Sequence, residues 1–313
     1  MSWDEKKKKA ALLLAFGCPE TLADVEPFIR NIFKDKAVPE SVIENIKERY
    51  SLIGGKSPLL DITRAQAKAI EEALNKSGKS GDTYKVYTAM RYSRPYIKDV
   101  LKEMRDAGYK DVIGLVMAPF NSPVSTGGYI NDVEAASQEE AGLPQVFFVS
   151  DWHILARFVD AVMEKIDEAM AAFAEKDDVL VILSSHSLPM SALEGDAYEM
   201  KVQQTIDLIG KRLKADYKAA YQSKSSGPKD WLGPSVEDVM AAAKKSGKTG
   251  VLVVPLGFVS DHVETLYDID ILFRKTAESL GLVFKRSASL NTSPKLMGLL
   301  ADLIRNRNFN YFY

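Results

Sequence analysis

Short apolar runs alternate along the chain with longer segments in which apolar positions recur every three or four residues. The apolar runs lie at 10–17, 84–90, 111–118, 144–149, 179–183, 251–256 and near 283. Valine-rich runs closed by proline or glycine are typical of strands that are buried on both faces of a parallel sheet. The intervening segments predict helices at 25–33, 40–50, 62–74, 95–107, 154–175, 196–214, 235–246, 261–280 and 293–306. This alternation predicts an α/β fold.

Four predicted strand ends resemble one another. LLLAFGCP and GLVMAPFNSP in the first half correspond to VLVILSSHSLP and GVLVVPLGFVSD in the second, each an apolar run followed by small residues. The repetition predicts two similar Rossmann-like lobes, at 1–150 and 151–292, each a parallel sheet flanked by helices. We expect the last helix, within 293–313, to fold back on the first lobe, and the four loops to surround one cleft.

Composition narrows the class of protein. The 313 residues carry a net charge of −2 with basic and acidic residues interspersed, so no nucleic-acid partner is expected. The single Cys18 excludes a disulfide framework, a cysteine-cluster zinc site and an iron–sulfur cluster held by this chain alone, and it favours a reducing, cytoplasmic location. The apolar run at 10–17 follows Asp4 and Glu5 and is too short for an export signal, and no segment is long enough to span a membrane.

Candidate metal-binding or catalytic residues follow the apolar run at 251–256. Asp261, Glu264 and Asp268 follow one another at spacings of three and four, which predicts one face of a helix that begins near Ser260. These acids would serve either to cap the helix or to lead a cation inward. Both interpretations remain open from the residues alone.

The three histidines differ in their surroundings. His186 sits between serines after the strand at 179–183, in the same place of the repeat as Glu264. A lone histidine is more often structural, but an imidazole that faces a carboxylate can bind Fe²⁺ or Zn²⁺ or accept a proton. His153 has no such partner in the sequence, and His262 is expected at most to orient its neighbours.

Polar residues elsewhere allow two interpretations. The stretch RYSLIGGKSPL at 49–59 is an ordinary turn or a place of close backbone approach to a ligand. Arg91 and Arg94 are surface charges or the rim of an acidic ligand's site, and Trp231 in the polar loop YQSKSSGPKDWLGP is a lid or a buried anchor.

Taken together, these motifs resemble the ferrochelatase family, which inserts ferrous iron into a porphyrin in the last stages of haem synthesis. The resemblance covers nearly the whole chain and is most specific in SHSLP and GFVSDHVETLYDID. It implies a two-lobed α/β chelatase fold with the porphyrin held in the cleft. It implies catalytic and metal-binding roles for His186 and Glu264, and an outer metal position at Asp268.

The resemblance also implies contacts with the porphyrin. The residues on or near such positions are Phe16, Arg49, Tyr50, Ser57 and Tyr129. Some Gram-positive members carry an iron-ligating tyrosine where this chain has Phe16, and many members carry a further acid where it has Leu272. No iron–sulfur cluster is expected, because the cysteine-rich tail of some members is absent, and Fe²⁺ is expected as a substrate with no prosthetic group.

The implied activity is a lyase reaction in which Fe²⁺ enters protoporphyrin IX and two protons leave. Coproporphyrin III is the alternative substrate. A related chelatase that loads cobalt or nickel into another tetrapyrrole is a further alternative, and a haem or porphyrin carrier would use the same cleft without turnover. Peripheral contact with a membrane, and a monomeric or homodimeric state, are both compatible with the sequence.

Overall fold

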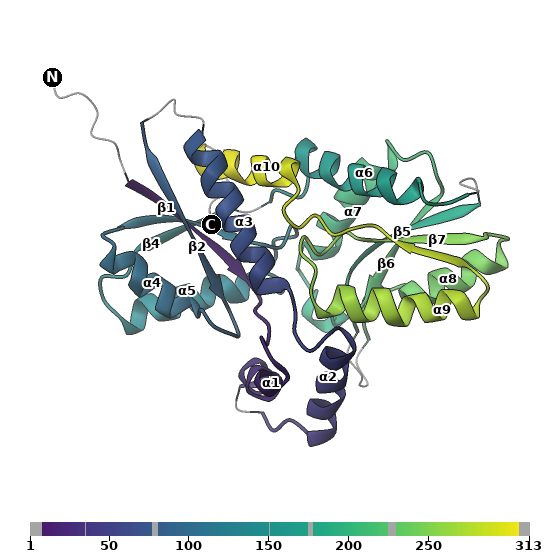
Figure 1. Ribbon diagram of the computed structural model, residues 1–313, viewed down its shortest axis with the longest axis horizontal. Helices are drawn as coiled ribbons and strands as arrows, with labels where there is room; N and C mark the ends of the chain where they lie inside the picture. The colour runs from purple at the N-terminus through teal and green to yellow at the C-terminus, as the bar shows by residue number, and fades with distance from the viewer. Residues whose placement is uncertain are drawn as a thin grey trace.

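Two four-stranded parallel sheets dominate the computed structural model, which describes residues 8–34, 36–76, 81–149, 151–174, 178–224 and 230–306. The first sheet has the order β2 (Thr83–Met90), β1 (Lys8–Ala15), β3 (Asp111–Val116), β4 (Gln145–Val149). The second has the order β6 (Tyr217–Gln222), β5 (Val179–His186), β7 (Gly250–Pro255), β8 (Val283–Arg286). Each sheet places its own strands in the same order, which confirms the predicted α/β fold of two similar units (Figure 1).

Helices cover both faces of each sheet. Those of the first half are α1 (Val25–Phe33), α2 (Glu40–Leu52), α3 (Leu59–Lys76), α4 (Ile97–Asp106) and α5 (Gly127–Glu139). Those that follow are α6 (Ala156–Met170), α7 (Tyr198–Gly210), α8 (Val236–Lys245), α9 (Arg274–Ser279) and α10 (Pro294–Arg305). Single turns of 3₁₀-helix lie at Leu22–Asp24 and Met190–Ala192, and a π-helix spans Glu264–Phe273.

The apolar runs form strands because both of their faces are buried. In β1, Leu12 and Leu14 pack with α4 and α5, whereas Leu13 points to the other face, toward α3. This second face belongs to a cluster that continues through α10, α6 and α7 to β5 and β7 of the second sheet. The two sheets therefore share a hydrophobic core, and burial of apolar surface fixes one against the other.

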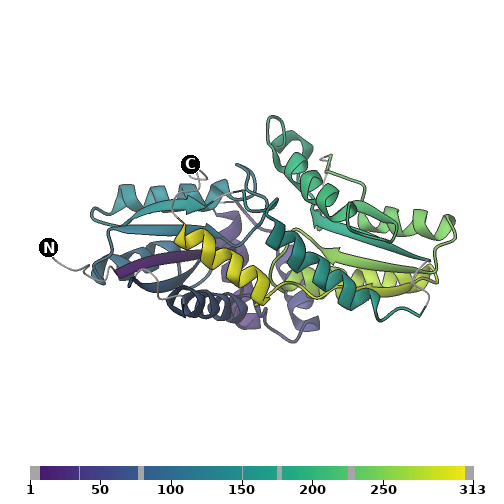
Figure 2. The same cartoon turned by 90° about the horizontal axis from the view of Figure 1, so that it is seen from above.

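The C-terminal helix joins the two halves. α10 packs against α3 and α6, and both views show it lying between the two sheets (Figures 1 and 2). Residue 150, the predicted boundary between the lobes, lies outside the described residues, as do 307–313 of the predicted last helix and 225–229 of the predicted polar loop. Within the described part of the chain, no helix combines the length and hydropathy that crossing a bilayer requires.

Two elements are absent from the sequence-based prediction. α5 begins with two glycines and buries only Tyr129, Val133 and Ala136, so its apolar pattern is too sparse to indicate a helix. β6 is an edge strand whose first half is partly exposed, and it therefore lacks a continuous apolar run. β5 also runs beyond the predicted end to His186, because Ser184 and Ser185 continue the pairing with β6.

The predicted helix at 261–280 was placed too early. The structure begins it at Glu264 and winds it as a π-helix to Phe273, before α9 continues. Asp261 precedes the helix, and its carboxylate binds Arg286 at 2.9 Å and Ser289 at 2.7 Å. The prediction that Asp261 shares a helix face with Glu264 and Asp268 is therefore wrong, because Asp261 is held by partners that are distant in sequence.

Candidate active site

One pocket is lined by the loops that follow β1, β3, β5 and β7, the four strands whose ends resemble one another in sequence. Residues 16–18 after β1, 117–120 after β3, His186 at the end of β5, and 257–260 after β7 all line it. Its volume is about 410 Å³, within the range of small-molecule sites. The carboxyl ends of parallel strands are the usual location of ligands in open α/β sheets. The predicted gathering of the four loops around one cleft is confirmed.

All eight site residues that the sequence singled out line this pocket. They are Phe16, Arg49, Tyr50, Ser57, Tyr129, His186, Glu264 and Asp268. α1 and α2, which form a small apolar cluster of their own, add Phe28, Ile29, Ile32 and Ile46 to the wall. The lining is mainly apolar, and among the described residues that form it Arg49 is the only arginine or lysine.

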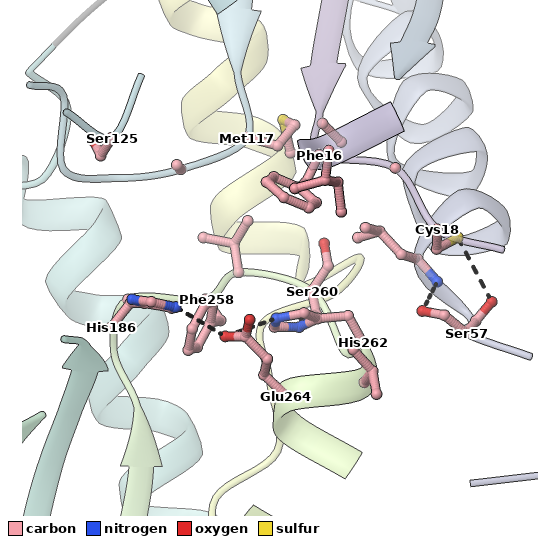
Figure 3. A pocket seen from close by; sticks show the side chains of 18 of the residues that line it. Phe16, Cys18, Ser57, Met117, Ser125, His186, Phe258, Ser260, His262 and Glu264 are labelled. Atoms are coloured by element: carbon pink, nitrogen blue, oxygen red, sulfur yellow. Dashed lines mark hydrogen bonds and ion pairs between the residues drawn. The ribbon is translucent and has the colours of Figure 1, made fainter. Parts of the chain in front are cut away.

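His186 and Glu264 face each other inside the pocket (Figure 3). The distance from His186 Nε2 to Glu264 Oε2 is 3.6 Å. His186 Nδ1 lies 2.5 Å from the backbone carbonyl of Ser187, to which it donates, so Nε2 is the atom that points at the carboxylate. A hydrogen bond of this kind from the other ring nitrogen is typical of metal-binding histidines. Glu264 Oε2 itself makes no hydrogen bond, although it is buried.

His262 completes this group. Its Nε2 lies 3.8 Å from the same oxygen of Glu264, and its Nδ1 lies 3.1 Å from the carbonyl of Ser260. Figure 3 shows the carboxylate between the two imidazole rings. The sequence-based prediction gave His262 only an orienting role. His262 is two residues before Glu264 in the sequence, but only the turn before the π-helix shows that its ring reaches the Glu264 carboxylate.

The electrostatics of the pair favour a charged carboxylate. Burial raises the pKa of Glu264, but His186 and His262 outweigh this and hold the pKa below its usual range. Burial lowers the pKa of His186, yet the Glu264 carboxylate has the stronger combined effect and the pKa is raised. Glu264 is therefore ionised, and its carboxylate can pair either with a protonated imidazole or with a metal cation that replaces the proton.

Asp268 lies farther along the π-helix and has different partners. Its Oδ2 accepts a hydrogen bond of 2.6 Å from Ser223, and Arg49 Nη1 lies 4.0 Å from Oδ1. Burial, together with the charge of Glu264, raises the pKa of Asp268 to about 6. Asp268 thus follows Glu264 on the same helix and lies next to Arg49, the arginine of the pocket wall.

The described residues contain no group of three or more His, Cys, Asp or Glu side chains arranged to hold a metal ion. His186 and Glu264 instead form an open pair. A borderline divalent cation bound by both atoms at roughly 2.1 Å and a tetrahedral angle would separate them by roughly 3.4 Å, close to the observed 3.6 Å. Such a pair leaves other coordination positions free for water or for incoming nitrogen ligands.

The proposed porphyrin contacts are set in different surroundings. Tyr50 and Tyr129 are almost fully buried, and burial raises the pKa of both phenols, so they remain neutral. Phe16 is 44% exposed and packs against Tyr92, with ring centroids 4.7 Å apart. Ser57 is buried near Cys18. The wall offers flat aromatic and aliphatic surface with few charges.

Other candidates lie outside the pocket lining. His153 is buried and bonds Gln204 at 3.0 Å, and Arg91 pairs with Asp132 at 2.7 Å.

Tyr198, which sequence reasoning missed, lines the pocket and donates a hydrogen bond of 2.9 Å to the carbonyl of His186. Its position just after Gly195-Asp196, at the start of a helix, carries no chemical signal in the sequence.

Comparison with known proteins identifies the family of this chain. A family model described as Ferrochelatase matches residues 8–308. A ferrochelatase from Geotalea uraniireducens is 38% identical over 317 residues, which cover 95% of this chain and 97% of that protein. A coproporphyrin III ferrochelatase from a Geobacillus species is 32% identical over 307 residues, covering 96% of this chain and 98% of that protein.

The fold has relatives among solved structures. SirB from Bacillus subtilis, solved with Fe³⁺, superposes with a TM-score of 0.60 and 11% identity, covering 98% of this chain and 100% of that one. This likeness concerns the fold alone. The family match and the curated relatives cover nearly the whole chain, and the chain belongs to the ferrochelatase family.

Proposed function

We propose that this protein inserts Fe²⁺ into protoporphyrin IX with release of two protons, in the cytoplasm and without a prosthetic group. The observation that carries the proposal is the pair formed by His186 Nε2 and Glu264 Oε2, 3.6 Å apart inside an apolar pocket. Imidazole and carboxylate suit a borderline divalent cation. Their open arrangement suits an ion that must be passed on to another ligand rather than retained.

Glu264, Asp268 and His186 have different roles in the proposed reaction. Glu264 and Asp268 draw hydrated Fe²⁺ along one side of the π-helix toward the pocket. His186, whose Nδ1–H is bonded to a carbonyl, presents Nε2 to the ion or accepts a pyrrole proton. Each metallation replaces two pyrrole N–H bonds by bonds to iron, so the site must accept two protons, and the His186–Glu264 pair offers acceptor atoms for them.

The charge of the wall supports protoporphyrin IX as the substrate. Protoporphyrin IX has two propionates and two vinyl groups, whereas coproporphyrin III has four propionates. Arg49 is the only arginine or lysine among the described lining residues, and α1 and α2 contribute apolar side chains. A vinyl group gains from such surroundings, whereas an unpaired carboxylate there would be costly. The similarity to a coproporphyrin III ferrochelatase makes coproporphyrin III the second candidate.

The test is an anaerobic assay with Fe²⁺ and either porphyrin, followed through the Soret band. We expect faster turnover of protoporphyrin IX, and loss of metallation by at least about a hundredfold in His186→Ala with porphyrin binding retained. Faster turnover of coproporphyrin III would overturn the choice of substrate. Tight porphyrin binding without turnover of either substrate would contradict the proposed reaction and favour a carrier.

A further inference from the structure

We propose that Lys201 is a positioning residue of the cleft. Its ammonium group holds the first-lobe loop at 117–126 against α7, and it thereby sets the spacing between the porphyrin-facing wall and His186. The proposal rests on the proposed function for the identity of the ligand. It concerns a residue that does not itself line the pocket and that carries no recognisable catalytic pattern.

The contacts of Lys201 cross between the two halves of the molecule. Its side chain is 11% exposed, and Nζ donates a hydrogen bond of 2.7 Å to the backbone carbonyl of Asn121, in the loop between β3 and α5. The same Nζ lies 2.5 Å from Asp151 Oδ1, in the connection between β4 and α6. A nearly buried cation needs such partners. One charge on α7 therefore binds two segments that follow strands of the other sheet.

A second pair of hydrogen bonds reinforces this connection. Asp196 Oδ2 accepts from the backbone N–H of Val124 at 3.1 Å, and Asp196 Oδ1 accepts from the N–H of Tyr198 at 2.7 Å. Lys201 in the first turn of α7 and Asp196 just before the helix thus hold the loop at 117–126 at two places, Asn121 and Val124. The bond from Lys201 to Asn121 and the bond from Val124 to Asp196 both use backbone groups of the loop, so they fix its path independently of its side chains.

The loop and α7 meet again at the active site. Phe120 and Ser125 of the loop line the pocket, and the ring of Phe120 packs edge-on against Tyr198 with centroids 6.0 Å apart. Tyr198 in turn bonds the carbonyl of His186 at 2.9 Å. One turn of α7 therefore carries the residue that holds His186 and the residue that holds the opposing wall. A shift of that wall changes how a flat ligand is presented to His186.

The experiment compares Lys201→Met with Lys248→Met. Lys248 is a matched control because its side chain is 18% exposed and pairs with Asp216 at 2.6 Å, just before β7 and therefore at the sheet end away from the pocket. We measure porphyrin Kd from the Soret shift without iron, and KM and kcat with iron. In Lys201→Met we expect Kd and KM to rise about tenfold and kcat to change less than about threefold. Lys248→Met should change none of the three.

The outcomes separate positioning from simple stability. If both variants lose similar thermal stability and Kd stays unchanged in both, Lys201 is merely structural and the proposal fails. If Lys201→Met does not fold, the test uses Asp196→Ala, which removes the bond to Val124 and the bond to the N–H of Tyr198. It should raise porphyrin Kd about threefold, and an unchanged Kd would also overturn the proposal. Because Kd is measured without iron, absence of wild-type turnover would count against the proposed function alone.

Discussion

At the scale of single residues, two backbone carbonyls determine how the site is arranged. Ser187 O and Ser260 O each accept from the Nδ1–H of a histidine, and both Nε2 atoms then face one oxygen of Glu264. The imidazoles lower the pKa of Glu264, and the carboxylate raises the pKa of His186. The geometry of this group therefore follows from local backbone shape as much as from the side chains themselves.

Arg49 gives the prediction that belongs to this scale. It lines the pocket, its guanidinium lies over the ring of Tyr267, and it is 4.0 Å from Asp268. Replacing it by methionine removes the arginine of the wall that can pair with a propionate. A charge-assisted hydrogen bond contributes about 1.5–3 kcal/mol, so we expect the KM for porphyrin to rise by roughly ten- to a hundredfold.

The measurement is steady-state metallation at varied porphyrin concentration. Lys56→Met is the control, because Lys56 lies in the same segment of the chain, pairs with Asp61 on the surface and does not line the pocket. An equal rise of KM in both variants would show that loss of any nearby positive charge is sufficient, and that Arg49 makes no specific contact.

At the scale of elements, the π-helix is what aims Glu264 into the pocket. π-helical turns are rare and concentrate at functional sites. This one begins at Glu264 itself and is held from outside by Arg286 on β8, whose guanidinium bonds Asp261 at 2.9 Å and Asp270 at 2.8 Å. One arginine thus ties the turn before the helix to its middle.

We expect Arg286→Met to destabilise the protein by about 3 kcal/mol, because it leaves two partly buried carboxylates without their cation. Urea unfolding measures the loss. Metallation should fall as well, since the segment that carries Glu264 loses its anchor. Arg274→Met is the comparison, because Arg274 donates to the carbonyl of Asp270 and lies over the ring of Phe284, 5.0 Å from its centroid, at an exposed position. Its replacement should cost less than about 1 kcal/mol. Similar losses in the two variants would contradict the anchoring role.

At the scale of the whole molecule, the two sheets are joined by a continuous core and by buried polar contacts. Gln66 of α3 donates to Ser260 Oγ and to the carbonyl of Asn291 at 2.9 and 2.8 Å, and Ser260 lines the pocket. His153 is buried near the same junction, bonded to Gln204 and packed edge-on against Phe120. The pocket exists because these contacts hold the two sets of loops together.

His153 makes stability depend on pH. Burial lowers its pKa, and the nearby Lys201 acts in the same direction, although Gln204 and Asp151 partly offset this. The unfolded chain then binds more protons than the folded one once the pH falls below about 6.5, so the free energy of unfolding decreases from there down to the folded pKa. Asp268 and His186, whose pKa values are raised, act in the opposite direction over the same pH range, so the test compares two proteins. In denaturant unfolding at pH 8 and pH 5.5, the wild type should lose stability relative to His153→Gln as the pH falls. An equal change of stability in both proteins would exclude the proposed effect of His153.

The sequence by itself determined most strands, most helices and the doubling of the fold, because buried strands must be apolar and their loops repeat a recognisable pattern. Eight residues that it singled out line the pocket: His186, Glu264 and Asp268 follow buried strands, and the family resemblance indicated Phe16, Arg49, Tyr50, Ser57 and Tyr129. It could not indicate α5 or β6, whose residues are only partly buried, or the π-helix, which depends on Arg286 from a distant strand. The repeat already predicted His186 and Glu264 in one cleft, but the position of His262 beside them and the contact of Lys201 with Asn121 were decided by tertiary structure alone. Pairing of β5 with β7 within one sheet brings His186 close to Glu264, whereas the packing of one half against the other brings Lys201 to Asn121, 80 positions away.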